Sequence, residues 1–198
     1  MKVRILVTSI AMGLCASAAF AQTTSQSTVQ RDVNQQTRIE QGLQSGSLST
    51  GEAARLEKEQ SSVDRLQARD MKDGKLSPRE RARLTAAQNK VSSDIKTAKT
   101  NDVTGNPQSA SSQRMRADVQ RNVSQQKRIE QGLQSGALTK HEAAGLERGQ
   151  ARVDHKEAVA GRDGHVGKRE QLAVQNAENR QSKRIRVQKH DAQVKPAV

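Results

Sequence analysis

Two carboxylates recur at one spacing around a glycine in both halves of the sequence. Asp73 and Glu80 bound the segment DGKLSPRE, and Asp163 and Glu170 bound the segment DGHVGKRE. Carboxylate oxygens are the ligands that Ca²⁺ prefers in proteins. These four residues are therefore the candidate metal ligands, and Ca²⁺ is the one cofactor that the sequence suggests.

This spacing resembles the second half of an EF-hand calcium loop, in which a glycine is followed by an aliphatic residue and a bidentate glutamate. The first half of such a loop carries carboxylates, but the corresponding positions are Arg69 and Met71 in one segment and Val159 and Gly161 in the other. The same glutamates also fit the S/T-x-x-E capping box that begins a helix. A degenerate calcium loop and a helix cap are therefore alternative interpretations of one pattern.

The sequence contains little that favours catalysis. Nucleotide-binding glycine motifs and the serine-hydrolase motif are absent. All four histidines lie in the second half of the chain, where their first-half counterparts are other residue types: His141, His155, His165 and His190. A role shared by both halves is not expected to disappear from one of them, so we expect a protein that is not an enzyme.

Positive charge is concentrated near the C-terminus. The densest basic cluster holds five residues, and it is the candidate site for anionic groups: Arg180, Lys183, Arg184, Arg186 and Lys189. The net charge of the whole chain is +13, which favours polyanionic partners. Nucleic acid is the weaker choice, because no Trp or Tyr is present to stack on bases.

The N-terminus has the form of a secretory signal peptide. Lys2 and Arg4 precede a short apolar run, and small residues lead to Ala19-Phe20-Ala21. We expect cleavage after Ala21, a periplasmic or secreted mature chain, and no transmembrane segment. The only cysteine, Cys15, lies inside this signal, so the mature chain has no disulfide.

The mature chain is an internal repeat. The stretch RIEQGLQSG occurs at residues 38–46 and again at 128–136, and residues 31–60 agree with residues 121–150 at 20 of 30 positions. The register continues without a gap through pairs such as Asp64 with Asp154. Within each unit, two similar loops lie 28 residues apart, at Ser45 and Asp73 in the first.

These loops predict where helices end and begin. Gly46, Gly74, Gly136 and Gly164 can end a helix with a positive φ, and Ser49, Ser77 and Thr139 are each followed three residues later by a glutamate. Gly42 and Gly132, inside the first helix of each unit, indicate either a close approach or a fraying end. Charges such as Glu57, Lys58 and Arg65 are expected on the outer faces of the helices.

The sequence therefore predicts an all-α protein of two tandem three-helix units joined by a flexible linker and partly disordered at its termini. The expected segments are a signal peptide (1–21), a disordered lead (22–28), unit 1 (29–99), a linker (100–118), unit 2 (119–189) and a tail (190–198). Whether the units pack together is left open.

The repeated pattern IEQGLxSGxL[ST]xxEAxxLE with DGKLxxxER resembles small exported proteins of proteobacteria, a resemblance that implies export but no activity. Residues 84–88, LTAAQ, resemble the LTxxQ signature of Spy and CpxP-type periplasmic chaperones, which implies binding of unfolded clients. We therefore expect a basic, helical envelope module that binds anionic envelope components or unfolded protein clients. The alternatives are a calcium-binding protein and a helical interaction scaffold.

Overall fold

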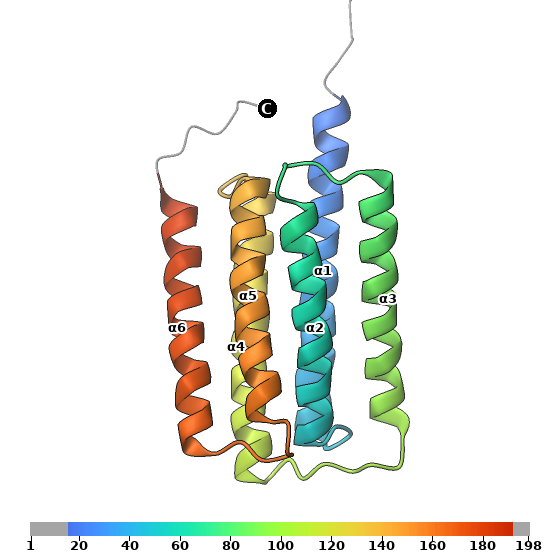
Figure 1. The fold of residues 1–198 in the computed structure, drawn as a ribbon, viewed down its shortest axis with the longest axis vertical. Helices are drawn as coiled ribbons and strands as arrows, with labels where there is room; N and C mark the ends of the chain where they lie inside the picture. Colours follow the sequence, from blue (N-terminus) through green and yellow to red (C-terminus); the bar gives the residue numbers. More distant parts are fainter. Residues whose placement is uncertain (1–15, 192–198) are drawn as a thin grey trace, which may run out of the picture.

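The computed structural model describes residues 16–191, and the side chains from residue 27 onward. This part of the chain forms six helices and no strand, which confirms the predicted all-α class (Figure 1). The helices are α1 (Ala16–Ser45), α2 (Thr50–Asp70), α3 (Pro78–Thr100), α4 (Ala110–Gln134), α5 (Lys140–Ala160) and α6 (Lys168–His190). Within it, no helix has the length and apolarity needed to span a bilayer. Most of the expected signal peptide (1–15) and the end of the tail (192–198) lie outside the described residues.

The helix starts follow from local capping chemistry. Ser49, Ser77 and Thr139 each accept a hydrogen bond from the backbone N–H of the glutamate three residues on, and that glutamate accepts one from the backbone N–H of the cap. Gly167 has no side chain to accept a hydrogen bond, so only the second bond of the capping box forms there, from the Gly167 N–H to Glu170 at 2.6 Å. The four loop glycines have φ between 67° and 82°, the left-handed region in which side chains are disfavoured.

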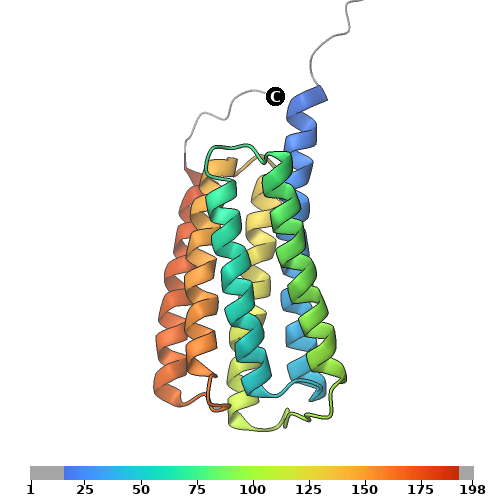
Figure 2. The same ribbon diagram turned by 45° about the vertical axis from the view of Figure 1, so that its right-hand side comes forward.

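The two repeat units pack into one bundle. The most extensive interfaces join α2 to α5 and α1 to α4, the equivalent helices of the two units. These four helices form an antiparallel core, with α3 on one side of it and α6 on the other (Figures 1 and 2). α1 and α4 run in opposite directions, as do α2 and α5, so an approximate twofold axis perpendicular to the helices relates the units (Figure 1). Near this axis the Ser61 hydroxyl donates to the Ala151 carbonyl at 2.8 Å, and these residues are equivalent positions of the repeat.

The segment between the units is shorter and more firmly held than the predicted flexible linker of residues 100–118. α4 begins at Ala110, after the cap Ser109, and the side chains of Ser112 and Met115 are buried. Gly105 donates its N–H to the Gly46 carbonyl at 2.8 Å. Because a Cβ at Gly105 would meet the Leu48 carbonyl oxygen at 2.2 Å, only glycine fits this contact.

The first helix also extends further than the sequence predicted. Residues 22–28, expected to be an irregular polar lead, lie within α1, and Thr28 and Val29 are buried. Two separate apolar clusters lie toward opposite ends of the bundle. One includes Ile39 and Leu43, and the other includes the equivalent residues Ile129 and Leu133. Buried polar side chains also lie in the core, among them Gln60 and Asp64 on α2 and Gln150 and Asp154 on α5.

Candidate metal centre

The inward-facing positions of α2 and α5 carry polar side chains. In α2 these are Glu57, Gln60, Asp64 and Gln67, at alternating spacings of three and four residues, and all are fully buried. This spacing is that of the seam of a coiled coil, which faces the partner helices. The equivalent positions in α5 are occupied by a similar set: Glu147, Gln150, Asp154 and Glu157.

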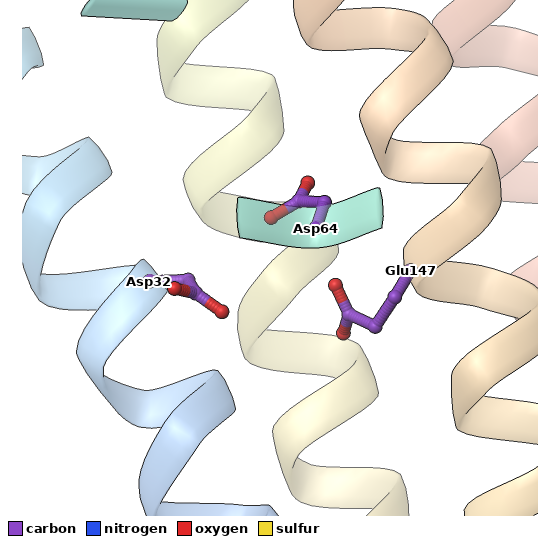
Figure 3. Close-up of side chains that lie close together, drawn as sticks. All are labelled: Asp32, Asp64 and Glu147. Atoms are coloured by element: carbon purple, nitrogen blue, oxygen red, sulfur yellow. The ribbon is translucent and has the colours of Figure 1, made fainter. Parts of the chain in front are cut away.

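Asp32, Asp64 and Glu147 converge from α1, α2 and α5 (Figure 3). One oxygen from each of these carboxylates lies within 4.8 Å of one from each of the others, and all three side chains have no exposed surface. We refer to them as the first acidic cluster. Because Asp32 and Asp64 come from unit 1 and Glu147 comes from unit 2, neither unit contains the whole cluster.

Glu57, Asp154 and Glu157 form a second acidic cluster. Their carboxylate oxygens also lie within 4.8 Å of one another, and these side chains too are fully buried. Here Glu57 comes from unit 1 and the other two come from unit 2. Both clusters therefore lie at the interface between the repeats.

Buried amides hold one oxygen of several of these carboxylates. Gln36 Nε2 donates to Glu57 Oε2 at 2.9 Å, and the equivalent Gln126 Nε2 donates to Glu147 Oε2 at 3.1 Å. Gln88 Nε2 donates to Asp32 Oδ1 at 2.8 Å. Each of these hydrogen bonds engages one oxygen of a carboxylate. The second oxygen of each carboxylate has no well-formed hydrogen bond.

The second cluster has an additional amide at its centre. Asn122 Nδ2 donates to Glu157 Oε2 at 2.6 Å and to Asp154 Oδ1 at 3.1 Å. Gln150 Nε2 donates to the side-chain oxygen Asn122 Oδ1 at 2.8 Å. The side chains of this cluster are thus fixed relative to one another across α4 and α5.

Every carboxylate in the two clusters retains an oxygen without a well-formed hydrogen bond, although Asp64 and Asp154 lie close enough to share a proton. These oxygens are Asp32 Oδ2, Glu57 Oε1, both oxygens of Asp64, Glu147 Oε1, Asp154 Oδ2 and Glu157 Oε1. No Lys, Arg or His side chain is buried among residues 27–191, so no basic residue there compensates their charge from within the core. An ionised carboxylate removed from water without a partner costs several kcal/mol.

The pKa values reflect this environment. Burial raises the pKa of Asp32 and of Asp154 to about 7. Burial, reinforced by the negative charges of neighbouring carboxylates, raises the pKa of Asp64, Glu147 and Glu157 well above the ordinary range. The pKa of Glu57 is raised in the same way. These carboxyls therefore retain their protons to a higher pH than exposed carboxyls do.

A smaller acidic group lies between α4 and α6. Burial raises the pKa of Asp118 to about 7 and that of Glu178 to about 8. Unlike the six core carboxylates, Glu178 has a basic partner, Arg121, whose Nη1 lies 3.0 Å from its Oε2. This group is therefore partly compensated from the surface.

The structure places the four loop carboxylates of the sequence analysis far from this arrangement. Asp73 and Asp163 each accept the backbone N–H two residues on, from Lys75 and His165. Glu80 accepts a hydrogen bond from the Ser77 N–H at 2.8 Å, and Glu170 accepts one from the Gly167 N–H at 2.6 Å. None of the four belongs to a group of three clustered ligands among the described residues. Their observed contacts are those of turns and helix caps.

The predicted basic cluster lies on α6. Arg180, Lys183, Arg184 and Arg186 are exposed and Lys189 is half-buried. Arg184 Nη2 donates to the Gly145 carbonyl oxygen at 3.2 Å, so this residue also ties α6 to α5. The remaining side chains leave a basic outer face on one flank of the bundle.

Sequence reasoning missed the core carboxylates, and it placed Glu57 on an outer face where the structure buries it. Charged residues on helices are usually exposed, so the residue types alone predict a surface position for these acids despite their spacing along the helix. The available signal was the three-and-four spacing of Glu57, Gln60, Asp64 and Gln67 beside Leu56 and Val63. Its repetition in α5 strengthened it.

Comparisons of the chain with known protein families, with curated proteins and with solved structures found no match.

Proposed function

We propose that this protein binds a hard divalent cation inside its helical core, at the interface between the two repeats. The observation that carries the proposal is the convergence of three fully buried carboxylates in each cluster with no basic side chain buried beside them. A cation would supply the compensating charge that the chain itself does not. Export of the mature chain, expected from the signal peptide, would expose it to extracytoplasmic cations.

The ligand chemistry favours Ca²⁺ or Mn²⁺. Every side chain in the clusters offers oxygen, and neither cysteine nor histidine is present there, which disfavours Zn²⁺ and copper. Ca²⁺ binds oxygens at about 2.3–2.6 Å, so ligands on opposite sides of the ion are about 4.6–5.2 Å apart. The cluster oxygens all lie within 4.8 Å of one another, close enough for a single ion of this size to contact all three. Mg²⁺ fits less well, because it retains several waters and the side chains leave the site fully buried.

Thermal unfolding of chelator-treated protein tests the proposal. We expect millimolar Ca²⁺ or Mn²⁺ to raise Tm near pH 8, because a ligand that binds only the folded state stabilises it by mass action. Mg²⁺ should raise it less. Asp64→Asn should weaken binding at the first cluster at least about tenfold, equivalent to about 1.4 kcal/mol.

Asp73→Asn is the matched control, because it removes a carboxylate from a surface loop that resembles an EF-hand. It should leave the cation response unchanged. A response lost in Asp73→Asn but kept in Asp64→Asn would place the site in the loops, and a response to none of the cations would reject the proposal.

A second function, binding to an anionic lipid surface, is favoured by the outer face of α6. From residue 179 to residue 190 this helix contains no acidic residue, and it carries Arg180, Lys183 and Arg186 exposed. A surface-bound basic residue contributes about 1 kcal/mol on an anionic membrane. Exposed large apolar side chains are scattered among the described residues at Val103, Val159, Leu172 and Val187, which favours a charged surface over an unfolded client.

Sedimentation with vesicles tests this function. The protein should bind vesicles rich in anionic phospholipid, lose binding at high salt, and not bind zwitterionic vesicles. Lys183→Glu with Arg186→Glu should abolish binding. The control Lys96→Glu changes the exposed α3 residue equivalent to Arg186 and should have little effect. Equal binding to both vesicle types would contradict this function.

A further inference from the structure

We infer that the core holds two cations, one in each acidic cluster. The two sites have the same types of ligand, but an acid and an amide that are part of each site have exchanged positions between the repeats. The inference rests on the proposed function and specifies the composition and occupancy of that site. It is carried by the positions of the cluster residues in the repeat.

Two ligands of each cluster are equivalent under the repeat. Asp64 in the first cluster corresponds to Asp154 in the second, and Glu147 corresponds to Glu57. In both cases the aspartate comes from one unit and the glutamate from the other. The pseudo-twofold axis therefore generates the same two-carboxylate core twice.

The third carboxylate comes from different positions. In the first cluster it is Asp32, whose equivalent in unit 2 is Asn122. In the second cluster it is Glu157, whose equivalent in unit 1 is Gln67. The first cluster thus has an acid at residue 32 and an amide at residue 67. The second has an amide at the equivalent residue 122 and an acid at the equivalent residue 157. The exchange keeps the number of carboxylates at three in both.

The acid and the amide are neighbours in both clusters. Asn122 Nδ2 lies 2.6 Å from Glu157 Oε2 in the second cluster. In the first cluster Gln67 lies beside Asp32, and with Gln60 it lowers the pKa of that carboxyl against the larger effect of burial. The exchange therefore places an acid beside an amide in both clusters.

Two buried amide groups beside the first cluster have hydrogen-bonding capacity that well-formed bonds do not use, although both lie close enough to Asp32 to lower its pKa. Gln60 and Gln67 have no exposed surface, yet neither the amide oxygen nor the amide nitrogen of either residue has a hydrogen-bond partner of good geometry. In the second cluster the oxygen of Gln150 is likewise unpartnered. A buried polar group without a partner costs about 1–3 kcal/mol, and amide oxygens are suitable Ca²⁺ ligands.

Native mass spectrometry and titration calorimetry with Ca²⁺ and Mn²⁺ on the mature chain test the inference by counting bound ions. The wild type should bind two ions. Asp32→Asn should lose the first site alone and Glu157→Gln the second alone, leaving one ion in each case. Circular dichroism should show an intact helical fold in both, because each substitution removes an uncompensated buried acid.

The exchanged double variants supply the decisive comparison. Asp32→Asn with Gln67→Glu gives the first cluster the arrangement of the second, and Glu157→Gln with Asn122→Asp does the reverse. Both should restore binding of two ions. A wild type that binds one ion, lost in both single variants, would overturn the inference while leaving cation binding intact. Two ions without restoration in the double variants would overturn the equivalence of the sites, and no binding at all would reject the proposed function itself.

Discussion

At the scale of single residues, the glycines inside the repeated RIEQGLQSG stretch have a packing role. A Cβ at Gly42 would lie 2.5 Å from Leu48 Cδ1, and one at Gly132 would lie 2.5 Å from Leu138 Cδ1. The Leu48 N–H also donates to the Gly42 carbonyl at 3.0 Å. The close approach is therefore made by the leucine of the following loop, which resolves the choice between a contact and a fraying helix end.

This contact predicts the sign of a substitution. Gly42→Ala or Gly132→Ala gains helix propensity of about 1 kcal/mol but forces a buried leucine from its position, and overpacking costs about 1–3 kcal/mol. We expect net destabilisation, measured by urea unfolding. Gly145→Ala is the control: this helical glycine has no neighbour within 4 Å of an added Cβ, so its substitution should stabilise the protein. Stabilisation at all three positions would contradict the packing role.

At the scale of the helices, the sequence was sufficient to predict where α2, α3 and α5 begin, but not where α1 and α4 begin. The starts of α2, α3 and α5 depend on Ser49, Ser77 and Thr139 and on the glutamates three residues later, all of them contacts within a single turn. Such local chemistry can be identified without knowing the fold. The paired loop carboxylates could be found for the same reason, although their observed contacts are those of caps and turns.

The burial of the core acids could not be predicted from local pattern alone. Glu57 and Asp64 lie next to Arg and Lys residues in sequence, as exposed helix carboxylates do. Their burial depends on α5 packing against α2, a contact between residues about one repeat apart in the chain. The acid–amide exchange at residues 32, 67, 122 and 157 acquires a meaning only once these positions are known to be neighbours.

At the scale of the whole molecule, the units depend on each other. Unit 1 alone would expose the faces of α1 and α2 that α4 and α5 cover, and Asp64 would lose Glu147 from its cluster. We therefore expect residues 27–101 to be largely unfolded when dilute and to gain helix only as a second copy replaces unit 2. Circular dichroism and light scattering over a concentration series would measure this. A stable helical monomer would contradict it.

The whole molecule also has an unusual predicted dependence on pH. In the folded state Asp32, Asp118 and Asp154 have pKa values raised to about 7 and Glu178 to about 8, so between pH 5 and 8 the folded chain binds more protons than the unfolded chain. The protonated forms of these four groups stabilise the folded state. This contribution is fully present below the pKa values that the groups have in the unfolded chain, and it is lost as pH rises through 7 to 8. Each additional proton contributes a slope of about 1.4 kcal/mol per pH unit.

The most direct test of a cation-binding core is thermal unfolding from pH 5 to 8, followed by circular dichroism with chelator and with millimolar Ca²⁺. With chelator, Tm should fall as pH rises. With Ca²⁺ it should fall much less, because the cation replaces the departing protons, and the difference should be greatest at pH 8. A Tm that rises with pH in chelator and is unchanged by Ca²⁺ or Mn²⁺ at pH 8 would contradict the central claim.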